Sequence, residues 1–215
     1  MITLYHYIHC PFCVRVRMAF GLLKLSYNSV VLPYDDEETP IKLTKKKMLP
    51  IASFDNENMN ESLDIIKKAD SSNLLNLELL KDQLLGDEVE ELLNEIARPV
   101  HNLVMPYWIF TKEFTPAARE YFLKKKEAKR GPFGPLMAKK QEFLDELELV
   151  IVKLETKLTP FYNGEGEVTI FDIMIASHLW GMYLFPEFQF PPFLHNYLQE
   201  IKRRTNFEYH QDYWK

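Results

Sequence analysis

The stretch HCPFCVRVR, residues 9–17, holds both cysteines of this 215-residue chain. A strand-like run, ITLYHY at residues 2–7, comes before it, and a strongly apolar, helix-like run, VRVRMAFGLLKL at residues 14–25, overlaps its end. Pro11 suits the first turn of a helix, where its missing N–H would have no partner in any case. The pattern therefore predicts that a strand delivers Cys10 to the start of a helix and that Cys13 lies one turn inside it.

Several kinds of chemistry use two cysteines at this spacing, and most of them fit this sequence poorly. A zinc site would need two more ligands, and only His6 and His9 lie nearby. Covalent haem attachment needs a histidine directly after the second cysteine, where this chain has valine. A disulfide across so short a loop would remove little chain entropy. We therefore expect redox chemistry without a metal, with Cys10 as the nucleophile and Cys13 as the resolving thiol.

The proposed nucleophile must be ionised near neutral pH. A free thiol has a pKa of about 8.5, and lowering it by about 3 makes the thiolate dominant. That change requires about 4 kcal/mol. A helix dipole contributes up to about 2 kcal/mol. The remainder is expected from backbone N–H groups and the Cys13 thiol, with Arg15 adding its field at Cys10.

The rest of the first seventy residues predicts a small α/β unit. YNSVVL at residues 27–32 and PIASF at residues 50–54 are rich in strand-forming types, and the turn sequence DNEN follows the second of them. The segment SLDIIKKA, residues 62–69, indicates a helix that begins with Ser62 as a capping residue. The expected order is strand, helix, strand, strand and helix.

The second half shows helical spacing and no strand-like segment, which predicts an all-α bundle of about five helices. Its expected helices are one over residues 89–103 that Pro99 kinks or splits, one from Thr115 and Pro116 to Gly131, one over residues 143–158 that ends at Pro160, and one that starts at the capping box Thr169 to Asp172.

Charge and composition argue against several partners. The net charge is −5 and the basic clusters are short and scattered, so we expect no nucleic-acid binding. The longest apolar stretch, residues 170–185, is interrupted by Asp172 and His178 and is shorter than the roughly 18 apolar residues that span a bilayer. With two cysteines and no secretory pattern at residue 1, we expect a cytoplasmic monomer without membrane contact.

Three short motifs together resemble the dithiol glutaredoxins. CPFC at residues 10–13 is similar to their CPYC site, Leu49-Pro50 to the valine and cis-proline of the thioredoxin fold, and Glu61-Ser62 to the pair that holds the γ-glutamyl end of glutathione. Phe12 in place of tyrosine and Leu49 in place of valine are departures that remove no reactive group. The resemblance implies a glutathione site formed by Cys10, Phe12, Leu49, Pro50, Glu61 and Ser62. Lys47 is expected in a solvated run, with the glycine carboxylate of glutathione as its alternative contact.

The helical half resembles that of glutathione transferases, and the whole chain is most similar to the large, transferase-shaped bacterial glutaredoxins of type two. DDEETP, MNESLDI, FTPAAREYF and KKKEA carry this likeness, which extends from residue 1 to about residue 130. The implied fold is a thioredoxin-like domain at residues 1–73, a linker at residues 74–84 and a transferase-like all-helical domain at residues 85–215.

The resemblance implies a glutathione-dependent thiol-disulfide oxidoreductase that uses glutathione as co-substrate. Its clients would be proteins with disulfides or glutathionylated cysteines. Two alternatives stay open. The helical half also suits a glutathione transferase that conjugates glutathione to electrophiles, and the same architecture could serve a non-enzymatic module that binds an iron-sulfur cluster or is gated by redox state.

Overall fold

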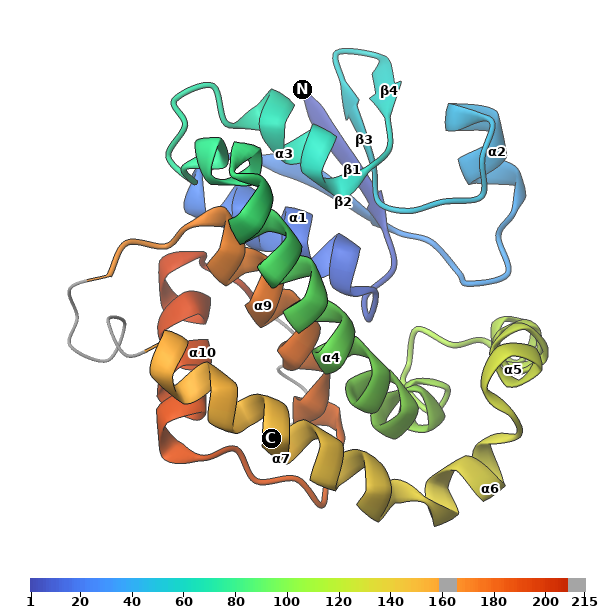
Figure 1. Cartoon of the computed structure of the whole chain (residues 1–215). Helices are drawn as coiled ribbons and strands as arrows, with labels where there is room; N and C mark the ends of the chain where they lie inside the picture. Colours follow the sequence, from blue (N-terminus) through green and yellow to red (C-terminus); the bar gives the residue numbers. More distant parts are fainter. Residues whose placement is uncertain (159–165, 209–215) are drawn as a thin grey trace.

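The first half of the computed structural model is a four-stranded sheet with helices on both sides. The structure describes residues 1–158 and 166–208. In chain order the elements of this half are β1 (Ile2–His6), α1 (Pro11–Leu22), β2 (Tyr27–Val31), α2 (Glu38–Thr44), β3 (Ile51–Phe54), β4 (Glu57–Met59) and α3 (Ser62–Ala69). This half forms the upper part of Figure 1.

The strand order in the sheet is β2-β1-β3-β4. β1 runs parallel to β2, as a crossover through a helix requires, and antiparallel to β3. β3 and β4 form a tight hairpin whose turn residues Asp55 and Asn56 have φ of 47° and 75°. The predicted order is confirmed, and α2 and β4 are additions to it. Pro40 is the only buried residue of α2, so this helix leaves no apolar periodicity in the sequence.

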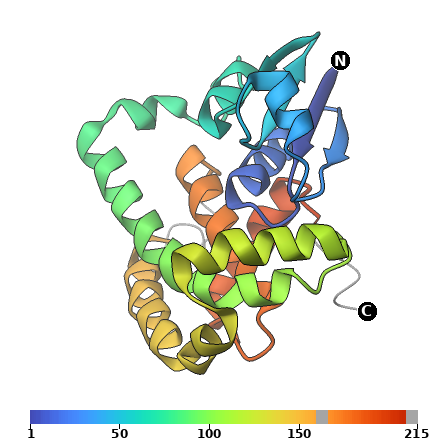
Figure 2. The same ribbon diagram turned by 90° about the vertical axis from the view of Figure 1, so that its right-hand side faces the viewer.

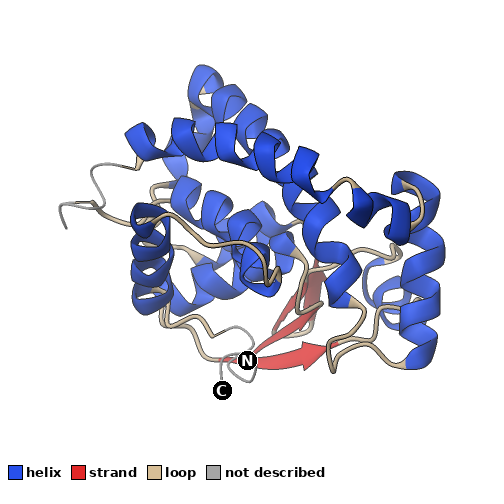
Figure 3. Cartoon of the chain, turned by 90° about the horizontal axis from the view of Figure 1, so that it is seen from below, coloured by secondary structure: helices blue, strands red, loops and turns tan. Residues whose placement is uncertain are grey.

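The second half is helical in all its described elements, as Figures 2 and 3 show. α4 is not split at Pro99, contrary to one of the two expected outcomes, and continues through Pro106 as well. The elements are the 3₁₀ helix η1 (Leu77–Lys81), then α4 (Gln83–Trp108), α5 (Pro116–Arg130), α6 (Phe133–Ala138), α7 (Lys140–Lys157), α9 (Ile170–Leu179), the 3₁₀ helix η2 (Trp180–Leu184) and α10 (Pro192–Arg204). The described part thus holds six α-helices where about five were expected.

Helix ends in this half follow the capping rules. The Thr115 side chain accepts a hydrogen bond from the backbone N–H of Ala118 at 3.1 Å, and Gly131 ends α5 with a φ of 84°. At the start of α9, the Asp172 carboxylate accepts a hydrogen bond from the backbone N–H of Thr169 at 2.8 Å, which completes the predicted capping box. α7 ends at Lys157, and Pro160 lies outside the described residues.

One hydrophobic core continues through both halves of the chain. α1 packs against α3 on the sheet side and against α9 of the helical half, which Figure 1 shows beside it. The packing against the last helix, α10, is so close that a Cβ at Gly21 would lie 1.6 Å from the backbone oxygen of Thr205. The helix that begins at the CPFC motif is therefore held from both sides. The proposed division at residues 73 and 85 stays a prediction.

Among the described residues, no helix is both long and apolar enough to cross a membrane.

Candidate active site

The start of α1 places the two cysteines as the sequence predicted. Cys10 is the N-cap residue with extended backbone (φ −69°, ψ 122°), and Pro11 follows in the first helical turn. Cys10 is half-buried, whereas Cys13 has no exposed surface and packs with Leu32, Leu49 and Ile51. Both cysteines are free thiols. Part of Cys10 is therefore open to solvent, whereas Cys13 is not.

Hydrogen bonds at this helix end make the two thiols unequal. The Cys13 side chain, donating to the Cys10 sulfur, is the largest cause of a lowered Cys10 pKa of about 7, and the backbone N–H groups of Cys13 and Phe12 contribute as well. Burial opposes this change. The pKa of Cys13 is raised by burial and by its neighbour Cys10. With a pKa of about 7, about half of Cys10 is thiolate at neutral pH.

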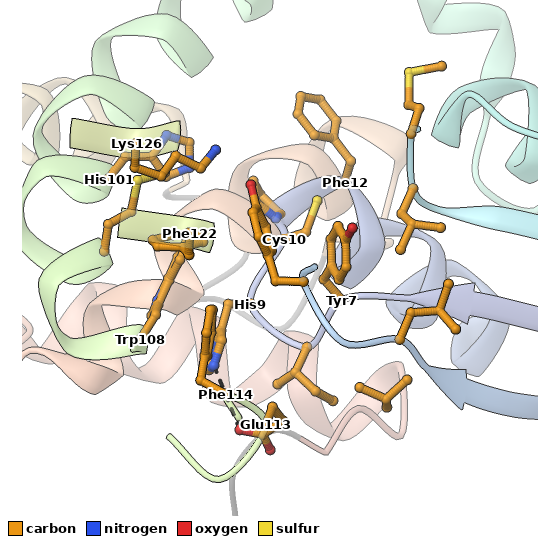
Figure 4. A pocket seen from close by; sticks show the side chains of 18 of the residues that line it. Tyr7, His9, Cys10, Phe12, His101, Trp108, Glu113, Phe114, Phe122 and Lys126 are labelled. Carbon is orange, nitrogen blue, oxygen red and sulfur yellow. Dashed lines mark ion pairs between the residues drawn. The ribbon is translucent and has the colours of Figure 1, made fainter. Parts of the chain in front are cut away.

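A cavity of about 300 Å³ opens in front of Cys10 between the two halves. Figure 4 shows Cys10 beside Tyr7 and Phe12, with side chains of the helical half on the far side. The walls are mostly aromatic and apolar. They include Tyr7, Phe12, Tyr34 and Leu49 from the first half and His101, Met105, Trp108, Phe114, Phe122 and Lys126 from the second.

Lys126 of α5 is a cation in this cavity that the sequence analysis missed. Its ammonium nitrogen lies 5.7 Å from the ring centroid of Tyr34 and 5.5 Å from that of Phe122. Its charge contributes to the lowered pKa of Cys10. Ala118, Phe122 and Lys126 recur every four residues, so their spacing puts Lys126 on the buried face of α5. That spacing was the signal that could have found it.

The expected cis-proline pair lies next to the cysteines. The peptide bond between Leu49 and Pro50 is cis, and β3 begins at the next residue. Leu49 is buried and lines the Cys10 cavity. Pro50 is buried beneath it and does not line the cavity.

Glu61 and Ser62 line a second cavity, of about 530 Å³, which shares Phe12 and His101 with the first. The expected capping role of Ser62 is wrong. Glu61 is the N-cap residue, with an unusual positive φ of 68°, and Ser62 is the first residue of α3. The Ser62 side chain accepts a hydrogen bond from Arg15 at 3.2 Å and is buried. Phe12, 46% exposed, stands between the two cavities and links the predicted binding residues into one surface.

Of two sequence expectations about charged residues, one needs correction. Lys47 is not solvated: only 18% of its side chain is exposed, and its ammonium donates to the backbone oxygen of Tyr34 at 3.1 Å and to the Tyr121 hydroxyl at 2.5 Å. Lys47 thereby connects the segment that precedes β3 with α5 of the helical half. Arg15 donates to Ser62 and, as expected, also interacts electrostatically with Cys10, while Lys126 is a second cation that contributes to the lowered pKa of Cys10.

The two histidines near the motif have partners of their own. A ring nitrogen of His6 lies 2.8 Å from the Ser29 hydroxyl, and one of His9 lies 2.8 Å from the Thr111 hydroxyl. The His9 ring also stacks on Trp108, with 5.3 Å between ring centroids. Among the described residues, no group of three histidine, cysteine or acidic side chains is placed to hold a metal ion.

Comparisons with known proteins agree with this geometry. The family profile of the glutaredoxin 2 C-terminal domain matches residues 88–213, and that of the glutathione S-transferase N-terminal domain matches residues 4–73. Glutaredoxin 2 of Escherichia coli K12 is 30% identical over 206 residues, which are 94% of each chain.

Solved structures show the same two-part architecture. Glutaredoxin 2 from Salmonella typhimurium, solved in complex with glutathione, superposes with a TM-score of 0.84 at 30% identity and covers 97% of this chain and 96% of its own. A glutathione transferase from Phanerochaete chrysosporium has a TM-score of 0.75 at 16% identity, covers 96% of this chain and 98% of its own, and shares the fold alone. The predicted fold, a thioredoxin-like part followed by a transferase-like helical part, is confirmed. This chain therefore belongs to the glutaredoxin 2 family of glutathione-dependent oxidoreductases.

Proposed function

We propose that the CPFC site reduces protein disulfides and glutathione mixed disulfides, with Cys10 as the nucleophile and Cys13 as the resolving thiol. The observation that carries this proposal is the unequal pair at one helix end. Cys10 is partly exposed and has a pKa lowered by hydrogen bonds to its charged form, while Cys13 has no exposed surface and a raised pKa.

In the proposed reaction, the Cys10 thiolate attacks the glutathione sulfur of a glutathionylated client. The client thiolate leaves, and a disulfide between Cys10 and glutathione forms. A second glutathione thiolate then attacks the glutathione sulfur of this disulfide, which frees Cys10 and releases glutathione disulfide. One free glutathione is thus oxidised for each client thiol released, and the other half of the glutathione disulfide comes from the client itself.

With a protein disulfide, Cys10 becomes covalently joined to the client. Cys13 then attacks the Cys10 sulfur, the second client thiolate leaves, and a disulfide between Cys10 and Cys13 results. Because Cys13 has no exposed surface, it can reach only a partner already bound to Cys10. Burial raises the pKa of Cys13, so its proton has to be transferred as it attacks. The client thiolate that leaves in this step can take up that proton.

We propose that glutathione lies across the two cavities. Its cysteine would lie at Cys10, beside Leu49 and the backbone before Pro50, and its γ-glutamyl end at Ser62. The backbone N–H groups of the first turn of α3 are unpaired within the helix and suit a carboxylate. Glu61 is placed to meet the α-amino group. Lys47, already near the Cys10 cavity, suits the glycine carboxylate.

The test compares two cysteine variants in two reactions. Cys10→Ser should abolish reduction of the mixed disulfide between 2-mercaptoethanol and glutathione. Cys13→Ser should retain this reaction and lose reduction of a protein disulfide. Full activity of Cys10→Ser in either assay would refute the proposed mechanism.

A glutathione transferase activity is a second candidate because the cavity in front of Cys10 has aromatic walls that suit an apolar electrophile. A conjugation assay with 1-chloro-2,4-dinitrobenzene decides between the two. Turnover faster than disulfide reduction would put the transferase first.

A further inference from the structure

Arg15 is a buried cation that interacts electrostatically with Cys10 but has no carboxylate partner among the described residues. Its side chain comes from α1, is only 4% exposed, and lines the cavity that also contains Glu61 and Ser62. One terminal nitrogen donates to the Ser62 hydroxyl at 3.2 Å, and Nε is buried without any partner. Within the described part of the chain, no carboxylate lies within ion-pair distance of this guanidinium. A buried charge of this kind is costly unless something compensates it.

The neighbouring side chains do not supply the missing charge. The guanidinium carbon lies 5.0 Å from the ring centroid of Phe12, which offers only a π face. His101 and His178 line the same cavity, and burial lowers their pKa values to about 3 and about 4, so both are neutral at pH 7. Burial also lowers the pKa of Arg15, to about 10, and the guanidinium therefore remains charged at that pH.

Donors converge at this end of the cavity. Arg15 donates to the Ser62 hydroxyl and keeps an unpaired Nε, and Ser62 is the first residue of α3, where the backbone N–H groups have no partner within the helix. A guanidinium binds carboxylates with paired hydrogen bonds, and a helix N-terminus favours an anion. The acidic side chains that line the cavity, Glu61, Asp64 and Glu90, are exposed at its rim, where they can meet an ammonium group. The cavity thus has hydrogen-bond donors for an anion at its inner end and carboxylates at its rim, an arrangement that matches an α-amino acid head group.

We infer that Arg15 is a specificity-determining residue of the glutathione site, which pairs with the α-carboxylate of the γ-glutamyl residue. This inference rests on the proposed function and deepens it. Ser62 holds both the ligand and Arg15, and Glu90 of α4 brings the helical half into the same subsite.

The test uses mixed disulfides of 2-mercaptoethanol with three tripeptides. Glutathione is the reference, 4-aminobutyryl-cysteinyl-glycine lacks the α-carboxylate, and glutaryl-cysteinyl-glycine lacks the α-ammonium. The wild-type protein should prefer glutathione to the carboxylate-free analogue by about 10- to 100-fold in kcat/KM, mainly through KM, because a hydrogen bond to a charged group is worth about that much. Arg15→Met should reduce this preference to about 1. It should leave the preference over the ammonium-free analogue unchanged.

Arg17→Met is the matched control because Arg17 lies on the same helix, outside the cavity, and donates to the backbone oxygen of Glu208. It should keep the wild-type preference between the tripeptides. Arg15→Lys retains the charge without the paired donors and should show an intermediate preference. An Arg15→Met protein that still prefers glutathione to the carboxylate-free analogue as strongly as the wild type would overturn the inference.

Thermal unfolding without ligand separates a binding role from a structural one. Because Arg15→Met removes an uncompensated buried charge, it should leave Tm unchanged or raise it. A Tm lower than that of Arg17→Met, or failure to fold, would make Arg15 structural and overturn the inference. Calorimetry with S-methylglutathione, which cannot exchange disulfides, measures the same subsite without turnover. If no mixed disulfide is reduced but Arg15→Met weakens this binding at least tenfold, the proposed redox function fails and the assignment of Arg15 stands.

Discussion

The hydrogen bond from the Cys13 thiol should set the reactivity of Cys10, and two substitutions at residue 13 can isolate it. Cys13→Ser keeps a donor beside the Cys10 sulfur, whereas Cys13→Ala removes it. This donor is the largest cause of the lowered Cys10 pKa of about 7. A hydrogen bond to a charged group contributes about 1.5 to 3 kcal/mol, and one pKa unit corresponds to about 1.4 kcal/mol. Cys13→Ala should therefore raise the pKa of Cys10 by about 1 to 2, while Cys13→Ser should leave it near 7.

The measurement is the rate of iodoacetamide alkylation at Cys10 between pH 5 and 10. Because only the thiolate reacts, the rate should fall about tenfold for each pH unit below the pKa. At pH 6 the Cys13→Ala protein should react about 10 to 100 times more slowly than Cys13→Ser. Both variants have a single thiol, so the label reports Cys10 alone. Equal midpoints for the two variants would show that the backbone and the surrounding charges, and not Cys13, lower the pKa.

Three further outcomes are expected. Lys126→Met should raise the pKa of Cys10 by less than Cys13→Ala does, since Lys126 contributes less than the thiol donor, and an unchanged alkylation profile would remove it from the site. Gly21→Ala should lower the free energy of unfolding, measured in urea, by about 3 kcal/mol because the new Cβ would meet backbone atoms. The control Gly86→Ala has open space around it and should raise this free energy by up to about 1 kcal/mol. Equal values for the two variants would contradict the packing of α1 on the last helix. Asp172→Ala should cost about 2 kcal/mol in the same assay through the lost capping bonds, and a change below about 0.5 kcal/mol would refute that role.

The sequence predicted the elements whose residues repeat a strong local pattern. The strand before Cys10, the helix after it and the capped start of α9 all depend on neighbours within a few positions. α2 and β4 escaped notice because they are short and mostly exposed, so burial imposes no periodicity on them. Of the two outcomes expected at Pro99, a kink or a split, the split does not occur because tertiary packing of α4 outweighs one missing backbone hydrogen bond.

The sequence predicted the reactive motif but not the side chains that surround it. The placement of the cysteines follows from local helix geometry around Pro11. The cavities that Lys126 and Arg15 line are formed by segments about a hundred and about fifty residues apart, so no local pattern specifies them. Runs of basic residues usually point to water, and only the four-residue spacing of Ala118, Phe122 and Lys126 indicates that Lys126 lies on a buried face.

The tight contact between Gly21 and Thr205 holds the first helix against the end of the last one, so the first half of the chain cannot be cut away without loss of packing around α1. A fragment that stops after α3 would expose to water the side of α1 that packs against α9 and α10. Such a fragment should aggregate or need a solubilising partner, even though it would hold both thiols. The redox half of this chain therefore depends for its solubility on the helices that follow it.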